Sequence, residues 1–203
     1  MKIICIGRNY LDHILEMKNE IPKEPQIFLK SDTSFLSNNT TFHIPSFATN
    51  LQFEAEIVLK ISKKGKNIPI SDAHQYFNEI TIGIDFTERD LQAKLLSERL
   101  SWEISKAFDE SAAVGDFIPI SGIKNMMDFD FHFTQNGKTV QKSNVRQLVF
   151  NFYHLISYIS VYFTLNPGDL IYTGTPSGVN RVYPGDQLEG FISNQKLLQI
   201  SVR

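Results

Sequence analysis

The chain lacks the residues and patterns that mark secreted, membrane-spanning and nucleic-acid-binding proteins. Among its 203 residues there is one cysteine, Cys5, so no internal disulfide can form, which is typical of a reducing compartment. A net charge of −2 supplies no basic surface for nucleic acid. The apolar run at residues 3–6 is too short for a signal peptide, and the apolar region 150–165 is interrupted and shorter than a bilayer requires. We therefore expect a cytoplasmic protein that binds neither nucleic acid nor membrane.

The composition is that of an ordinary globular protein. Hydrophobic residues make up 42% of the chain and charged residues 21%. The length suits a single domain with a sizeable core. Because the sequence shows no repeat of domain size, no low-complexity segment and no linker, we predict one domain over residues 1–203, with residues 1–50 as its N-terminal part.

Two glutamates stand in the strand-like sequence LQFEAEIVLKI, residues 51–61. Apolar residues alternate there with Glu54 and Glu56, which predicts one strand with a buried face. The alternation puts both carboxylates on the same side, with Cα atoms about 6.5–7 Å apart. Carboxylates this close repel and lose hydration, and a cation between them would offset both costs. An isolated E-x-E on a strand, however, is more typical of an exposed acidic face.

A third carboxylate favours the metal interpretation. A second strand-like run, EITIGIDF at residues 79–86, has its isoleucines on one face and Asp85 on the other. Gly83 on that second face leaves room for close approach. Three carboxylates without thiolate or imidazole suit a hard cation, Mg²⁺ first and then Mn²⁺ or Ca²⁺.

His13 and Glu16 are three residues apart in a segment that predicts a helix from Tyr10 to about Met17, so they share a helix face. On a random surface helix such a pair merely meets solvent. Alternatively, the carboxylate orients the imidazole and makes it a better base, which could hold and deprotonate a water molecule.

Arg89 and Gln92 also share a helix face, shortly after Asp85. Thr87 is positioned to cap that helix, with Asp90 completing a capping box. A cation and an amide beside a metal site could grip a carboxylate substrate, but an exposed helix face would have the same pattern.

Lys106 lies in the largely apolar segment WEISKAFD, residues 102–109. A lysine in such surroundings could neutralise an enolate. It could equally extend its ammonium group to water along an apolar surface. The residues alone leave both roles open.

Taken together, the motifs resemble the fumarylacetoacetate hydrolase family along almost the whole chain. They occur in the order IGRNYLDHILEM, FLKSDTSF, FEAEIVLKI, GIDFTERDLQ, SKAFD and LNPGDLIYTGTPSGV. In length and motif content the chain is similar to the small branch of acylpyruvate hydrolases that also decarboxylate oxaloacetate. The resemblance implies an α+β, β-rich fold with mixed sheets rolled into a barrel-like core, and usually a homodimer.

The resemblance also assigns roles to individual residues. It implies that Glu54, Glu56 and Asp85 bind the metal, and that His13 and Glu16 form a water-activating dyad on a mobile lid helix. Lys106 would lie beside the bound substrate. The implied substrate contacts are Arg89, Gln92, Thr175 and, less directly, Arg8.

The implied activity is divalent-metal-dependent cleavage of C–C bonds in acylpyruvate-type 2,4-dioxo acids, or decarboxylation of oxaloacetate, through a pyruvate enolate. One alternative is a keto–enol tautomerase or isomerase of a related dicarboxylic oxo acid, such as 2-hydroxyhepta-2,4-diene-1,7-dioate isomerase. A non-enzymatic alternative is a metal-stabilised β domain that serves as a binding module. A scaffold has no need of an H-x-x-E helix, which favours the enzyme.

Overall fold

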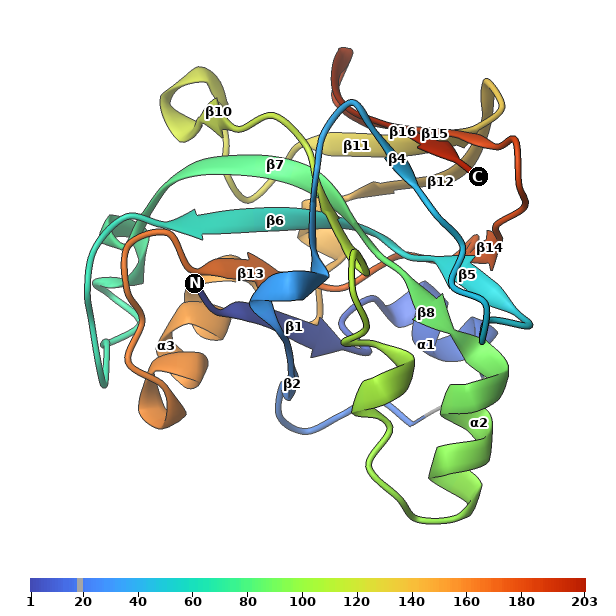
Figure 1. Ribbon diagram of the computed structural model, residues 1–203. Helices are drawn as coiled ribbons and strands as arrows, with labels where there is room; N and C mark the ends of the chain where they lie inside the picture. The colour runs from blue at the N-terminus through green and yellow to red at the C-terminus, as the bar shows by residue number, and fades with distance from the viewer. Residues whose placement is uncertain (18–19) are drawn as a thin grey trace.

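The computed structural model describes residues 1–17 and 20–203 of the chain (Figure 1). Most of the regular structure is β-strand, arranged in three sheets. The large sheet contains, in spatial order, β2 (Gln26–Lys30), β1 (Ile3–Gly7), β13 (Leu170–Tyr172), β6 (Ala55–Ile61), β7 (Phe77–Asp85), β9 (Ala112–Val114) and β3 (Phe35–Ser37), and β10 (Ile118–Pro119) also pairs with β7.

Two smaller sheets and three α-helices complete these parts of the chain. The second sheet has the order β12 (Lys138–Asn144), β11 (Asp130–Gln135), β15 (Gln187–Ile192), β16 (Gln195–Val202) and β4 (Thr40–Phe42). The third has the order β14 (Asn180–Arg181), β5 (Leu51–Phe53) and β8 (Thr87–Glu88). The helices are α1 (Leu11–Glu16), α2 (Arg89–Ser97) and α3 (Phe152–Tyr162), and short 3₁₀ turns are η1 (Asp32–Ser34), η2 (Ala73–Gln75), η3 (Glu103–Ser105), η4 (Ile120–Gly122) and η5 (Val145–Gln147).

The predicted fold class is confirmed. The large sheet is mixed, because β1 runs parallel to β13 and antiparallel to β2. Its long central strands β6 and β7 curve across the molecule, with the second sheet on one side and α3 with β1 and β13 on the other (Figure 1). This is the β-rich, barrel-like arrangement that the family resemblance implied.

Aromatic and branched side chains fill the space between the sheets. Phe42 of β4 stacks on Phe86, which follows β7, with 4.0 Å between ring centroids. Burial of each such ring stabilises the fold by about 1.5–3 kcal/mol. Gly190 of β15 lies against Ile82 of β7, so that an added Cβ would come within 2.7 Å of the isoleucine side chain. The absence of a side chain at Gly190 thus lets the two sheets approach closely.

The prediction of one continuous strand over residues 51–61 is wrong. The strand ends at Phe53 and resumes at Ala55, and the two halves belong to different sheets. Leu51 pairs with Glu88 of β8, whereas Ala55 pairs with Ile84 of β7. Glu54 is the residue at which the chain passes from the third sheet to the large one. The alternation continues through this transition, which keeps Glu54 and Glu56 on one side.

The apolar region 150–165 forms α3. Asn151 caps this helix, because its side-chain oxygen accepts a hydrogen bond from the His154 N–H at 3.0 Å. Its buried apolar residues, Phe152, Leu155, Ile156 and Ile159, follow helical spacing and face the core. Within residues 1–17 and 20–203, no helix is long and apolar enough to cross a membrane.

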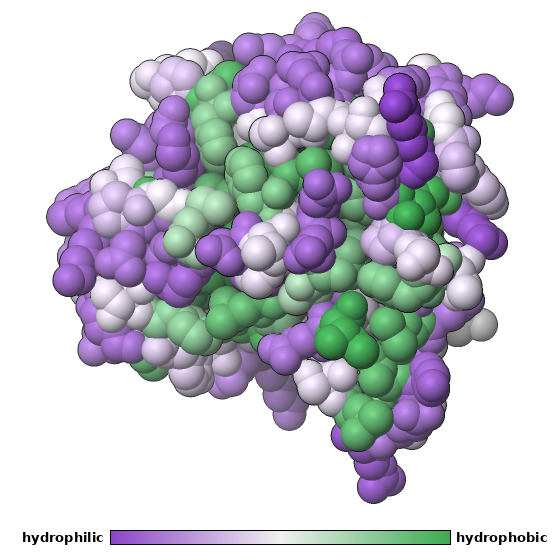
Figure 2. Space-filling view, in the orientation of Figure 1, coloured by the Kyte–Doolittle hydropathy of each residue, from purple (hydrophilic) through white to green (hydrophobic). Residues whose placement is uncertain are grey.

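Large apolar side chains are exposed on and near α2. Leu96, Leu100 and Ile104 each expose about half of their surface or more, at 49%, 54% and 62%. Figure 2 shows green side chains gathered over the region of α2 and η3. This surface adjoins a groove of about 680 Å³ whose walls include Phe47, Leu91, Ile104 and Phe108.

Candidate active site

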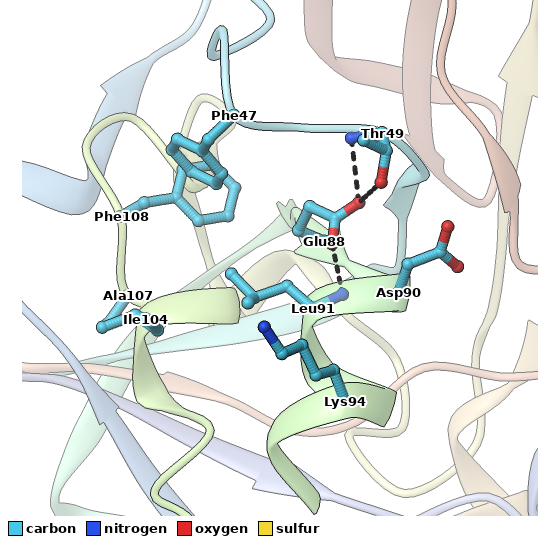
Figure 3. A pocket seen from close by; sticks show the side chains of 9 residues that line it. All are labelled: Phe47, Thr49, Glu88, Asp90, Leu91, Lys94, Ile104, Ala107 and Phe108. Atoms are coloured by element: carbon cyan, nitrogen blue, oxygen red, sulfur yellow. Dashed lines mark hydrogen bonds between the residues drawn. The ribbon is translucent and has the colours of Figure 1, made fainter.

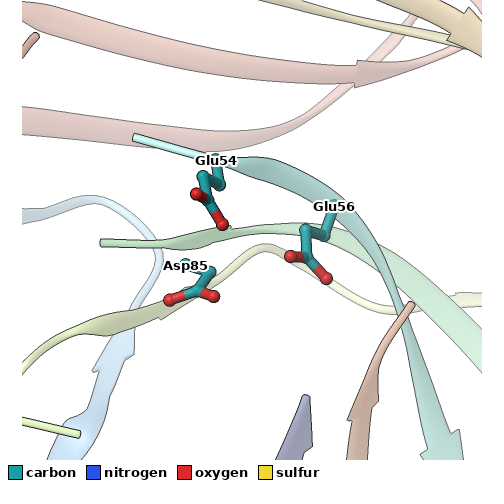
Figure 4. A group of neighbouring side chains, drawn as sticks. All are labelled: Glu54, Glu56 and Asp85. Carbon is teal, nitrogen blue, oxygen red and sulfur yellow. The ribbon is translucent and has the colours of Figure 1, made fainter. Parts of the chain in front are cut away.

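Three carboxylates from different segments meet at the ends of the central strands. Glu54 lies between β5 and β6, Glu56 lies in β6, and Asp85 ends β7. All three are buried, and each offers an oxygen within 4.8 Å of those of the other two (Figure 4). The backbone holds them together, because the Asp85 N–H donates to the Glu54 carbonyl oxygen at 2.9 Å.

Three cationic side chains surround two of these carboxylates. Lys106 Nζ lies 2.8 Å from Glu54 Oε2 and 2.7 Å from Asp85 Oδ2, so its ammonium group bridges them. The Arg89 guanidinium pairs with Glu54 Oε1. Lys30 Nζ lies 2.8 Å from Asp85 Oδ1 as an ion pair without the geometry of a hydrogen bond. Lys106 is itself buried, and thus its ammonium group is directed at the carboxylates and does not reach bulk water.

The pKa shifts reflect this uneven distribution of cations. Burial alone would raise the pKa of Glu54, but Lys106 and Arg89 outweigh it and hold that pKa well below its usual range. Burial, Asp85 and Glu54 together raise the pKa of Glu56 well above its usual value. For Lys106, burial would lower the pKa, but Asp85 and Glu54 outweigh burial and raise it.

The surroundings of Glu56 fit a divalent cation. Among the residues that the structure describes, no cationic side chain forms an ion pair with it. Its Oε2 accepts a hydrogen bond from the Gly174 N–H at 2.6 Å. A buried carboxylate without a cationic partner, in a cluster whose ligand atoms are all oxygen, suits a hard ion such as Mg²⁺ or Mn²⁺. Glu54, Glu56 and Asp85 could therefore hold one.

Sequence reasoning missed Lys30. Its fully buried ammonium group donates to Ser111 O at 3.1 Å, to Ser111 Oγ at 3.0 Å and to the Lys106 carbonyl oxygen. Lys30 therefore fixes both Asp85 and the backbone that carries Lys106. A signal was present in the sequence, because alternation along β2 places Lys30 on the same side as the apolar Phe28.

His13 and Glu16 form a dyad on α1, which is shorter at each end than the predicted helix. His13 Nδ1 lies 3.0 Å from Glu16 Oε2. The helix is tied to the loop after β13, because the Gly178 N–H donates to Glu16 Oε1 at 3.2 Å and Ser177 Oγ donates to Asp12 at 2.8 Å. The imidazole is nearly buried, and its partner carboxylate is held from two sides.

Arg89 is the first residue of α2, and Gln92 follows three residues later. The Glu88 carboxylate fixes the start of this helix (Figure 3). The predicted capping by Thr87 is wrong, because Thr87 is in β8 and the Glu88 carboxylate caps the helix instead. Glu88 accepts hydrogen bonds from Leu91 N at 2.5 Å, Asn50 N at 2.6 Å, Thr49 N at 3.1 Å and Thr49 Oγ1 at 3.2 Å. Arg89 in turn donates to Gln92 Oε1 at 2.8 Å.

These groups face one cavity of about 520 Å³. Nine of the ten predicted site residues line it, and Glu16 reaches it through His13. The nine are Arg8, His13, Glu54, Glu56, Asp85, Arg89, Gln92, Lys106 and Thr175. Met17, Phe28, Leu96 and Trp102 supply apolar wall. The larger groove at Phe47 is lined by none of these nine residues. Its one glutamate, Glu88, already accepts hydrogen bonds from the surrounding backbone. The smaller cavity is therefore the candidate active site.

Comparison with known proteins identifies the family. The family model for the C-terminal domain of fumarylacetoacetate (FAA) hydrolase matches residues 2–202. The chain belongs to the fumarylacetoacetate hydrolase family. A mitochondrial oxaloacetate tautomerase from Caenorhabditis elegans is 39% identical over 93% of this chain and 88% of its own length. A mitochondrial oxaloacetate decarboxylase from Dictyostelium discoideum is 40% identical over 93% of this chain and 87% of its own length.

Solved structures of similar proteins have the same fold. A fumarylpyruvate hydrolase from Pseudomonas aeruginosa, solved with Mn²⁺ and pyruvate, superposes with a TM-score of 0.92 at 32% identity, covering 100% of this chain and 90% of that one. A 5-carboxymethyl-2-hydroxymuconate delta-isomerase from Mycobacterium smegmatis superposes with a TM-score of 0.87 at 30% identity, covering 99% and 78%. The relatives are enzymes, and they differ in the reaction that they are named for.

Proposed function

We propose that this protein is a divalent-metal-dependent enzyme that converts oxaloacetate between its keto and enol forms. The observation that carries the proposal is the His13–Glu16 dyad on the same cavity as three buried carboxylates. A proton must leave carbon and reach oxygen in this reaction, which calls for a positioned base. The two relatives of about 40% identity, both named for oxaloacetate chemistry, support this choice of substrate.

The charge of the site suits a dicarboxylate. Glu54, Glu56 and Asp85 face the cationic side chains of Lys30, Lys106 and Arg89, so the cluster is close to neutral without a metal. A divalent cation on the three carboxylates then gives the site a net positive charge. Oxaloacetate carries two negative charges, and the proposed contacts Arg8, Arg89, Gln92 and Thr175 would orient it with their polar groups.

In the proposed mechanism, His13 removes a proton from C3 of oxaloacetate and returns a proton to the enolate oxygen. Glu16 holds the imidazole through Nδ1, which leaves Nε2 to exchange the proton. Lys106 places a positive charge beside the developing enolate. Mg²⁺ or Mn²⁺ on Glu54, Glu56 and Asp85 would supply Lewis-acid stabilisation of that negative charge.

Cleavage of acylpyruvates is a second candidate, supported by the neighbouring fumarylpyruvate hydrolase structure with Mn²⁺ and pyruvate. Here His13 would take a proton from water, and the resulting hydroxide would attack the distal carbonyl carbon. The C–C bond then breaks, an acid is released, and the pyruvate enolate takes up a proton. Decarboxylation of oxaloacetate would give the same enolate with loss of CO₂, without an attacking water.

A substrate panel tests the proposal. Purified protein with Mg²⁺ would receive enol oxaloacetate, acetylpyruvate and fumarylpyruvate, with enol absorbance and pyruvate formation followed separately. We expect the enol absorbance of oxaloacetate to relax well above the uncatalysed rate before pyruvate forms. Faster loss of acylpyruvates with stoichiometric pyruvate would favour the hydrolase instead. A protein that binds metal and turns over none of the three would be a binding module, against the proposal.

The homodimer and the cytoplasmic location remain predictions that rest on the sequence. Sedimentation equilibrium of the purified chain would give its mass in solution and test the first. Localisation of the tagged chain in its own cells would test the second.

A further inference from the structure

Gln141 of β12 reaches across to the proposed metal site from the second sheet. Its side chain is 1% exposed. Oε1 accepts a hydrogen bond from the Ala55 N–H at 2.9 Å, and Nε2 donates to Thr175 Oγ1 at 2.8 Å and to Pro176 O at 2.8 Å. Thr175 Oγ1 in turn donates to the Ala55 carbonyl oxygen at 2.9 Å. Both backbone groups of Ala55 are thus held by side chains.

These hydrogen bonds take the place of pairing with β13, which ends before it reaches Ala55. Strand β13 pairs with β6 as far as Val58, and Thr173 still bonds the Ile57 carbonyl oxygen. Beyond that point, Ala55 lies where β6 begins and has no partner strand on this side. The amide of Gln141 and the hydroxyl of Thr175 therefore continue the hydrogen-bond ladder.

Ala55 is the residue between the two glutamates. Its backbone orientation decides how the Glu54 and Glu56 carboxylates are spaced and directed, and this segment is also the passage between two sheets. Without hydrogen bonds on this side, the junction could rotate and separate the two carboxylates. A ligand pair binds a cation tightly only when the surrounding hydrogen bonds hold it in place.

We infer that Gln141 is a positioning residue of the proposed metal centre: it fixes Ala55 and Thr175 and so preorganises Glu54 and Glu56 for a divalent cation. The inference rests on the proposed function, since it needs a metal on these carboxylates. The same arrangement limits how Thr175 can contact substrate, because its hydroxyl hydrogen is directed at the Ala55 carbonyl oxygen. Thr175 would then contact substrate through an oxygen lone pair or its backbone.

Calorimetric titration of EDTA-stripped protein with Mn²⁺ tests this role without any measurement of turnover. Gln141→Met removes all three hydrogen bonds at similar side-chain length, and we expect its Kd for Mn²⁺ to rise about 10–100-fold. Thr175→Val removes the other half of the arrangement at nearly constant shape and should also weaken binding. Circular dichroism would show whether Gln141→Met folds. If it does not fold, Thr175→Val still tests the inference.

Gln135→Met is the matched control. Gln135 belongs to the neighbouring strand β11, and its amide donates to Arg181 O at 2.9 Å and to Asp186 Oδ2 at 2.7 Å, away from the carboxylate cluster. Its loss should lower thermal stability and leave the Kd unchanged. If the parent binds Mn²⁺ and both Gln141→Met and Thr175→Val bind it equally well, the inference is overturned while the proposed function stands. If the parent binds no divalent cation, both are overturned.

Discussion

Lys30 and Asp85 form a buried ion pair, with Nζ 2.8 Å from Oδ1 and both side chains shielded from solvent. The pair joins the end of β2 to the end of β7, and Ser111 accepts further hydrogen bonds from the same ammonium group. Asp85 is thus held by Lys30 on one oxygen and by Lys106 on the other. A buried pair of this kind contributes little beyond an apolar pair, but loss of Lys30 would leave the buried carboxylates with one cation fewer.

Lys30→Met is therefore expected to destabilise the protein by about 3–5 kcal/mol, since it leaves Asp85 with one cation fewer in the interior. Lys60→Met is the control, because the Lys60–Glu79 pair has the same 2.8 Å separation with both side chains more than one-third exposed. Its loss should cost about 0–1 kcal/mol. Urea unfolding followed by fluorescence measures both. Equal losses in the two variants would contradict the buried role of Lys30.

The dyad gives a prediction that separates chemistry from binding. His13→Ala should lower tautomerisation or hydrolysis by about 10²–10⁴-fold, the usual contribution of a general base. Its affinity for Mn²⁺ should stay close to that of the parent, because His13 does not belong to the carboxylate cluster. His74→Ala removes an exposed histidine bonded to Ser71 O and serves as the control. Parent-like turnover in His13→Ala would remove the dyad from the mechanism.

Glu16 and Lys106 should affect the possible reactions differently. Decarboxylation of oxaloacetate needs no base, so Glu16→Ala should reduce it less than it reduces tautomerisation or acylpyruvate hydrolysis. In the proposed mechanism Lys106 lies beside the enolate common to all three reactions, so Lys106→Ala should reduce them together. The kcat/KM values of the parent and both variants give the ratios. Equal losses of every activity in Glu16→Ala would mean that Glu16 orders α1 against the Gly178 loop and does not chiefly tune the base.

The raised pKa of Glu56 predicts how pH acts on the metal-free and metal-bound protein. Burial and the neighbouring carboxylates raise this pKa in the folded state, so folding favours the protonated carboxyl group. Its stabilising contribution is present below the unfolded pKa and is lost as the pH rises through the higher folded value. A metal must displace this proton, and therefore the affinity for Mn²⁺ should increase with pH over the same interval. An affinity independent of pH there would contradict a metal-ligating Glu56.

The local signals in the sequence predicted how the candidate site residues are arranged better than they predicted the backbone that carries them. Alternation put Glu54 and Glu56 on one side, and helical spacing put His13 beside Glu16, because both patterns depend on nearby residues. The alternation did not indicate that the strand ends at Glu54, because the alternating pattern continues where the chain passes from one sheet to the other. The pairing of Leu51 with Glu88, 37 positions apart in the numbering, decided that break.

Residues whose partners lie far along the chain could not be predicted. Lys30 meets Ser111, 81 residues away, and Gln141 meets Ala55, 86 residues away. A buried lysine is stable only with its partners in place, and nothing local to β2 identifies them. At the start of α2, the sequence predicted Thr87 as the cap, but strand pairing places Thr87 in β8 and Glu88 caps the helix instead.

We propose that turnover requires a divalent cation on Glu54, Glu56 and Asp85. The most direct test adds Mg²⁺ back to EDTA-stripped protein while the enol absorbance of oxaloacetate is followed. We predict that stripped protein shows only the uncatalysed rate and that Mg²⁺ restores activity. Glu56→Gln, which removes one charge at nearly constant shape, should need much more Mg²⁺ for the same effect. Full activity in the presence of excess EDTA would contradict the account.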